Sequence, residues 1–135
     1  MRELMHRKLI VTSLIGVGLV IPTMVLAQND EWKQKMEDAQ EAKDDLMDAI
    51  GAKSGPKAVE ATAKMTKILK ETKEYWAGLK MADIVKLADT NLAALDAMSK
   101  LAASGKMDQA KAAFDKVGDS CSACHDIHPE KRLTK

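Results

Sequence analysis

The feature that most constrains the fold of this chain is a helix-forming pattern that three short breaks interrupt. From about residue 28 the sequence is rich in Ala, Lys, Met, Leu, Glu and Asp and poor in β-branched and aromatic residues, which favours helix and gives no strand pattern. The breaks are Gly51–Gly55 followed by Pro56, Gly78–Ala82, and Ser104–Lys106. They predict four helices, over about 29–50, 56–76, 83–103 and from 107 onward.

In each segment, the residues that we expect to face the core recur at three- and four-residue steps, so each predicted helix has one inner face. The expected inner faces are Trp32, Met36, Ala39, Lys43, Leu46 and Ile50 in the first helix, Val59, Ala63, Thr66, Leu69 and Lys73 or Tyr75 in the second, Ile84, Leu87, Ala88, Leu92, Leu95, Met98 and Leu101 or Ala102 in the third, and Ala110, Phe114, Val117, Cys121 and Cys124 in the fourth. Short connections force neighbouring helices to run antiparallel. The predicted fold is therefore all-α, an up-down-up-down antiparallel four-helix bundle.

The first 27 residues have the pattern of an export signal. Three basic residues precede an uncharged, mostly apolar stretch, Leu9–Leu26, and small residues occupy the positions that signal peptidase reads before Gln28. We expect cleavage after Ala27, which leaves residues 28–135 as one domain. An uncleaved membrane anchor is the alternative, and Pro22 disfavours it.

The charge balance excludes some classes of partner. The whole chain has a formal net charge of +1, and the segment 1–27 contains three basic residues and one acidic residue, so its removal leaves −1. A nearly neutral domain has no electrostatic footprint for nucleic acid, and we expect no membrane association after cleavage. The sequence also has no Gly-rich phosphate loop and no Ser-His-Asp pattern, so we do not expect an enzyme.

The run Cys-Ser-Ala-Cys-His contains both cysteines of the chain, Cys121 and Cys124, followed directly by His125. This spacing is typical of covalent haem attachment. Two thiols at this separation can bond to the two vinyl groups on one edge of the macrocycle, and the next residue then lies beneath the ring, where its imidazole can bind iron. The motif predicts one covalent haem c, attached at Cys121 and Cys124 and ligated by His125.

Three other uses of these residues compete with haem attachment. A thioredoxin-like dithiol would need a βαβ context, which the helical pattern does not offer. A structural zinc site would need about four ligands, and the predicted mature chain adds only His128. A disulfide between the two cysteines would gain little from so small a loop. The export signal, the helical pattern and the C-terminal position all favour haem.

The stretch Ala112–Asp126, with its Ala-Phe, Val-Gly and Cys-x-x-Cys-His, resembles the fourth helix of the class II c-type cytochromes, the cytochrome c-prime group and its low-spin relatives. The resemblance covers the mature chain in architecture and is motif-specific from about residue 105. It implies a bundle with one haem near its open end, a periplasmic location in a Gram-negative-type bacterium, and a possible homodimer through the first two helices. The chain departs from the family after the motif, where His128, Lys131 and Arg132 stand in place of an aromatic and a basic residue, and its first two connections are short.

The resemblance makes the sixth iron position decisive. In the cytochrome c-prime branch this position is empty and packed by an apolar side chain, whereas in the low-spin branch a Met of the first helix fills it. In the predicted bundle the end of the fourth helix lies beside the start of the first, where Met36 falls in the second turn; Met47 lies about 16 Å further along. Met36 also has Leu46 ten residues after it, as in some low-spin relatives. We expect Met36 to be the sixth ligand, and ordinary core packing of Met36 is the alternative.

These expectations predict a periplasmic mono-haem cytochrome that transfers single electrons to and from redox partner proteins, with iron held by His125 and Met36. The alternative is a five-coordinate, cytochrome c-prime-like protein that binds NO or CO, and a haem-free helical interaction module is a third reading. Trp32, Tyr75 and Trp76 fall at helix ends that are expected to meet near the haem. We expect His128 to cap its helix and meet a propionate rather than ligate iron, and an imidazole free in solvent is the alternative.

Overall fold

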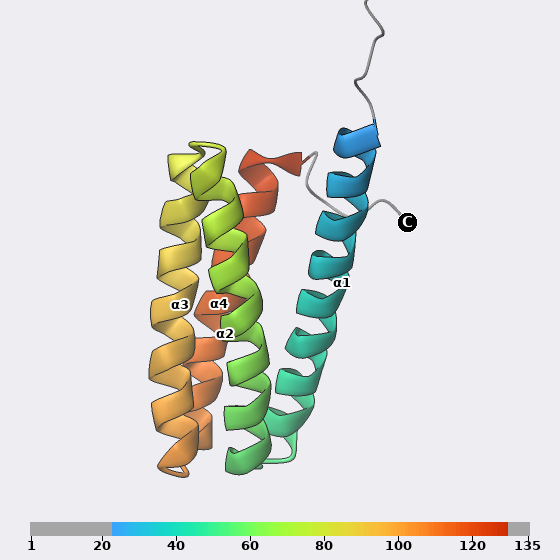
Figure 1. Cartoon of the computed structure of the whole chain (residues 1–135). Coiled ribbons are helices and arrows are strands. Elements are labelled where there is room, and N and C mark those ends of the chain that lie inside the picture. The colour runs from blue at the N-terminus through green and yellow to red at the C-terminus, as the bar shows by residue number, and fades with distance from the viewer. Residues whose placement is uncertain (1–22, 130–135) are drawn as a thin grey trace, which may run out of the picture.

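The computed structural model describes the backbone of residues 23–129 and the side chains of residues 31–129. It contains four helices in this range, and each runs antiparallel to the one before it (Figure 1). Their bounds are α1 Thr23–Gly51, α2 Gly55–Gly78, α3 Ala82–Ala103 and α4 Met107–Ile127. The predicted all-α four-helix bundle is confirmed.

The helix bounds agree with the predicted ones to within two residues, except at the start of α1. This helix begins at Thr23, so it runs through the expected cleavage site after Ala27. Most of the predicted export signal, residues 1–22, lies outside the described residues, and its cleavage stays a prediction.

The three turns between the helices share one backbone geometry. In each, the second residue after the helix has a positive φ, at Lys53 (51°), Lys80 (59°) and Gly105 (73°). The next residue then donates its N–H to the carbonyl five residues back, from Ser54, Met81 and Lys106 to Ala49, Trp76 and Leu101. This is the Schellman arrangement, which satisfies carbonyls at a helix end. It reverses the chain within three residues and so fixes the antiparallel order.

The first helix packs less evenly than the other three. Helix α3 packs closely on both α2 and α4, whereas α1 packs along α2 but barely touches α4. Figure 1 shows α1 leaning away from the rest of the bundle toward the end that holds its N-terminus and the C-terminus of α4. The bundle is therefore closed at the end of the 52–54 turn and open at the other.

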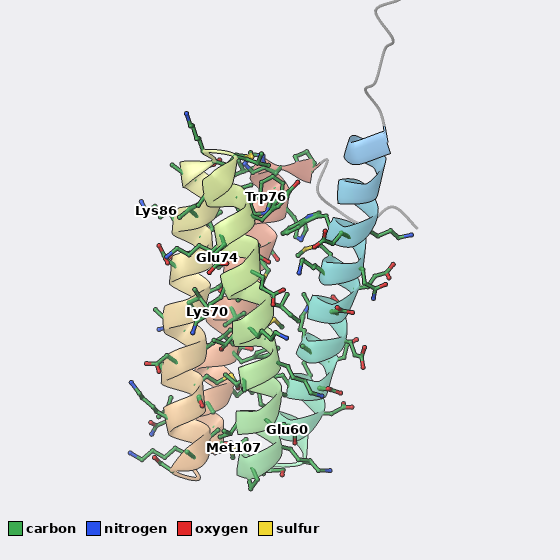
Figure 2. All side chains as sticks on the ribbon, viewed as in Figure 1. Glu60, Lys70, Glu74, Trp76, Lys86 and Met107 are labelled. Carbon is green, nitrogen blue, oxygen red and sulfur yellow. The ribbon has the colours of Figure 1, made fainter. Side chains whose placement is uncertain are left out.

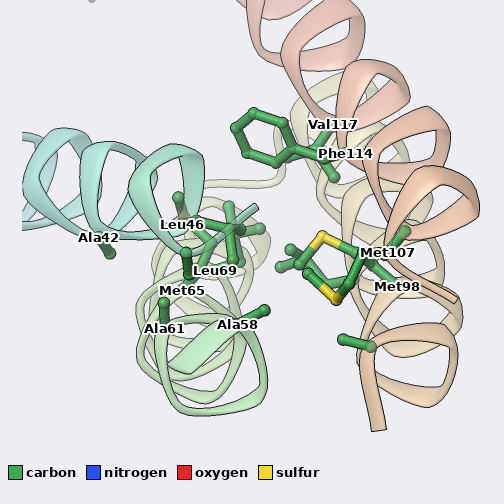
Figure 3. Packing of buried hydrophobic residues seen from close by; sticks show 14 residues of the cluster. Ala42, Leu46, Ala58, Ala61, Met65, Leu69, Met98, Met107, Phe114 and Val117 are labelled. Carbon is green, nitrogen blue, oxygen red and sulfur yellow. The ribbon is translucent and has the colours of Figure 1, made fainter. Parts of the chain in front are cut away.

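The hydrophobic core fills the closed end and the middle of the bundle (Figure 3). Leu46, Leu95 and Met98 have no exposed surface, and small residues such as Ala58 and Ala110 let the helices approach closely. Gly55 shows how closely: a Cβ atom there would lie 2.6 Å from the carbonyl oxygen of Ala102. Helices α2 and α3 thus leave no space between them at this point.

The inner face of α2 differs from the predicted one. Its buried residues are Ala58, Ala61, Thr62, Met65, Leu69, Thr72 and Trp76. The predicted Ala63 is exposed, and Val59 and Thr66 are only partly buried. Leu69 was predicted correctly, but the other positions were wrong by about one residue, or 100° of helix rotation, because Ala and Thr give little signal of burial. The predicted faces of α3 and α4 agree more closely with the buried residues.

Candidate haem site

The open end of the bundle contains a groove between α1 and α4. Residues of α1, α2 and α4 line a cavity of about 440 Å³ that includes Met36, Lys43, Gly118, Cys121 and His125. A second cavity of about 80 Å³ adjoins it and extends to α3.

The wall common to both cavities consists of four residues, Met36, Leu69, Cys121 and His125. They come from α1, α2 and α4, so the two cavities lie next to each other between these helices. The predicted site residues therefore meet in one place.

The attachment motif lies in the last two turns of α4. Cys121 and His125 are four residues apart and Cys121 and Cys124 three apart, so their side chains share one face of the helix, and all three border the smaller cavity. In the described residues the two sulfur atoms are not joined in a disulfide, and no group of three or more His, Cys, Asp or Glu side chains could hold a metal ion. The described side chains thus do not assemble the zinc site or the disulfide that were weighed against haem.

Met36 borders the groove from the other side. It is half-buried on α1, and it lines both cavities together with His125 of α4. Met47, eleven residues further on, is 52% exposed and lines neither cavity, as its distance along the helix predicts. Met65 borders the larger cavity but is otherwise part of the core. Of the methionines in the described side chains, Met36 alone borders both cavities.

Three aromatic residues form a cluster, and two of them, Trp32 and Trp76, border the smaller cavity. The rings of Trp32 and Tyr75 stack with centroids 5.0 Å apart, and Trp76 meets both edge-on at 5.0 and 4.9 Å. Figure 2 shows Trp76 at the end of the bundle where α4 terminates. The prediction that these helix ends meet is confirmed, and the cluster ties the start of α1 to the end of α2.

Two buried polar atoms fit a site that accommodates a further group. The indole Nε1 of Trp32 and the amide Oδ1 of Asn91 have no hydrogen-bond partner among the described residues, and both side chains border the smaller cavity. Buried polar atoms are nearly always paired in a finished structure. Sequence reasoning missed Asn91; its position on the apolar stripe of α3, between Ala88 and Leu95, was the available signal.

Gly118 is independent evidence that this site accommodates a further group. It lies in the middle of α4, where Gly costs about 1 kcal/mol relative to Ala. Yet a Cβ atom at this position would meet nothing within 4 Å, and the residue borders the larger cavity. No protein neighbour requires a Gly here. Open space beside the Cys and His side chains suits a flat, largely apolar group, so the residues present fit a haem.

Burial and charge act in opposite directions on Cys121. Burial raises the pKa of its thiol, while the Lys43 ammonium and the Asn91 amide lower it. Lys43 is half-buried and borders the larger cavity, where it places a positive charge in an otherwise mostly apolar wall. The thiol therefore stays protonated near neutral pH, with two groups nearby that favour a more negative sulfur.

His128 caps α4 and pairs with a residue at the start of α3. Its backbone N–H donates to the carbonyl of Cys124 at 2.8 Å, and its Nε2 lies 2.8 Å from the Asp83 carboxylate. Hydrogen bonding from His128, then from the backbone of Ile84, lowers the pKa of Asp83. The predicted capping role is confirmed. The pairing with Asp83 was not predicted, because the two residues are far apart in the sequence.

Comparison with known proteins agrees with this site. Residues 70–128 match a family model described as Cytochrome C', while no curated protein and no solved structure matches the chain. The matched segment includes Cys121, Cys124 and His125 and stops short of α1, so it does not include Met36. Residues 70–128 are thus similar to the cytochrome C' family, which is consistent with the class II c-type cytochrome that the motif predicts.

Proposed function

We propose that this protein is a mono-haem c-type cytochrome that carries single electrons, with haem c bonded to Cys121 and Cys124 and iron ligated by His125 and Met36. The observation that carries the proposal is that Met36 and His125 border the same groove from α1 and α4. A haem bound there supplies one-electron exchange between ferrous and ferric iron. A thioether opposite an imidazole favours ferrous iron and so a higher potential.

The side chains around the groove support this role. His125 offers an imidazole nitrogen and Met36 a thioether sulfur, both of which are axial ligands that haem iron accepts. The Trp32, Tyr75 and Trp76 cluster excludes water from one end of the groove, which also favours the ferrous state. We therefore propose electron exchange with partner proteins rather than substrate turnover.

The proposed location is the periplasm. It is supported by the export-signal pattern in residues 1–27 and by the attachment motif, because bacterial haem c is joined to its protein outside the cytoplasm. Among the described helices, none is long and apolar enough to cross a membrane.

A second candidate function is small-gas binding by five-coordinate iron. It is favoured by the family match, which bears the name of the cytochrome c-prime group and stops short of the helix that carries Met36. In that case Met36 and Leu69 would only pack over the iron. The two candidates differ in one atom, the ligand opposite His125.

Optical spectra of the purified protein test both candidates. The protein is expressed with a cytochrome maturation system, and ferric and ferrous spectra are recorded with and without carbon monoxide. We expect a low-spin ferrous spectrum that carbon monoxide does not shift, and a high-spin, carbon-monoxide-sensitive spectrum for Met36→Ala. Met47→Ala, on the same helix but exposed, is the matched control and should retain the low-spin spectrum.

Two outcomes would contradict the proposal at different levels. A wild-type spectrum that is high-spin and shifts with carbon monoxide would replace the electron carrier with the gas-binding candidate. Absence of a Soret band in the matured protein would exclude the haem itself, and with it both candidates.

A further inference from the structure

Asn91 is a buried polar side chain at the centre of the open end. It is only 4% exposed and borders the smaller cavity with Cys121, Cys124 and His125. The residues before and after it on the buried face of α3 are Ala88 and Leu95. Burying an amide in such a stripe costs free energy unless the amide is hydrogen-bonded. The hydrogen-bond partner of the Asn91 amide therefore indicates the role of this residue.

That partner is a cysteine of the attachment motif. The Nδ2 of Asn91 donates a hydrogen bond to the Sγ of Cys121, over 3.6 Å. The direction of this bond is the one that persists after haem attachment, because a thioether sulfur carries no proton and can only accept. The amide thus remains a donor to Cys121 whether the sulfur is a thiol or a thioether.

We propose that Asn91 is a positioning residue that holds the Cys121 sulfur at the haem edge and raises the reduction potential of the iron through this hydrogen bond. The proposal rests on the proposed attachment of haem at Cys121. A donor to the sulfur draws electron density away from the thioether, which favours the ferrous state. Hydrogen bonds to ligating or attached groups are a general means by which proteins tune a redox centre.

The variant Asn91→Leu separates this effect from a change of polarity. Leu is close to Asn in size but has no donor, and it makes the surroundings of the haem more apolar. A more apolar site disfavours ferric iron and would raise the potential. Loss of the hydrogen bond lowers it. The two explanations predict opposite signs, and neither depends on electron-transfer activity.

The experiment is a spectroelectrochemical titration of the haem-loaded protein. We expect Asn91→Leu to move the ferrous–ferric equilibrium three- to tenfold toward ferric, which is about 30–60 mV at 59 mV per tenfold for one electron. Thr62→Val is the matched control, since Thr62 is also buried and hydrogen-bonded, to the carbonyl of Ala58, but lines neither cavity of the groove. Its potential should equal that of the wild type.

The outcomes are distinguishable from failure of the proposed function. An unchanged or higher potential in a haem-loaded Asn91→Leu protein overturns the role of Asn91 and leaves the cytochrome intact. A wild-type protein that acquires no covalent haem overturns both. If Asn91→Leu does not fold, Asn91→Val removes the same donor from a smaller side chain, and the sign of its shift decides in the same way.

Discussion

Leu95 and Asn91 lie four residues apart on the buried face of α3, and their surroundings represent the two ends of the bundle. Leu95 has no exposed surface and belongs to an apolar cluster built from all four helices. Asn91 is nearly as buried, but it faces a cavity bordered by the attachment motif, and its Oδ1 has no partner in the described part of the chain. The core around Leu95 is filled by side chains of the bundle, whereas the space beside Asn91 is not.

This difference follows from where α1 leaves the bundle. At the closed end α1 is tied to α2 by a three-residue turn, and Leu46 and Ala49 fill the space beside it. At the open end α1 stays on α2 through Trp32 and the Lys35–Glu71 ion pair while it stands away from α4. The well-packed core and the cavities beside the motif therefore lie toward different ends of the same four helices.

The largest expected effect is the loss of stability when the packed core is disrupted. Leu95→Ala should destabilise the protein by roughly 2–5 kcal/mol, because it leaves a cavity in a fully packed core. Leu87→Ala, two turns earlier on α3, should cost about 1 kcal/mol, since Leu87 is only partly buried and borders the smaller cavity. Denaturant unfolding of both variants measures the difference. Equal losses would show that the two ends contribute alike to stability.

Substitutions of Gly55 at the closed end and Gly118 beside the groove compare the two ends directly. Gly55→Ala should destabilise the bundle by about 1–3 kcal/mol, because the new methyl group would meet the Ala102 carbonyl oxygen. Gly118→Ala has space for its methyl group and should change the free energy of unfolding by less than about 1 kcal/mol, yet it narrows the groove. Haem content per protein should fall for Gly118→Ala and not for Gly55→Ala. The reverse pattern of haem loss would contradict the assignment of the groove.

How far the sequence could predict this structure depends on how local each signal is. The breaks at Gly51–Gly55, Gly78–Ala82 and Ser104–Lys106 act through the backbone of a few residues, so the helix bounds followed from them. The Cys-x-x-Cys-His spacing is equally local. The choice of the buried face of α2 has no such local signal. Its Ala and Thr residues are tolerated on either face, and only the neighbouring helices select the buried one.

The site beyond the motif was predictable only in part. Met36 and the aromatic residues followed from the order of the helices, since that order brings their ends together. The hydrogen bond from Asn91 to Cys121 joins residues thirty positions apart, and no local pattern encodes it. The same holds for the separation of α1 from α4, which depends on packing along the whole length of both helices.

The turns offer a smaller test, one at each end. Lys53 at the closed end and Lys80 at the open end both have a positive φ, which costs less for Gly than for Lys. Lys53→Gly and Lys80→Gly should each stabilise the protein by about 0.5–1 kcal/mol, and Gly105→Ala, in the equivalent position, should destabilise it by a similar amount. Thermal unfolding measures all three. A clearly smaller gain for Lys80→Gly would show that the open end unfolds before the rest of the bundle.

The smallest expected effect concerns the ion pair that holds α1 to α2 at the open end. The Lys35 ammonium donates to the Glu71 carboxylate at 2.6 Å; this hydrogen bond lowers the pKa of Glu71 and raises that of Lys35. A lowered carboxylate pKa contributes stability above its ordinary value, near 4.5, and that stability is lost as the pH falls through the folded-state pKa. The raised pKa of Lys35 keeps its contribution up to strongly alkaline pH. We therefore expect the wild-type protein to lose slightly more stability than Glu71→Gln between neutral pH and about pH 3, with Glu74→Gln, exposed on the same helix, as the control. Parallel unfolding curves for wild type and Glu71→Gln over this range would mean that Trp32 and its aromatic partners hold α1 in place without help from the ion pair.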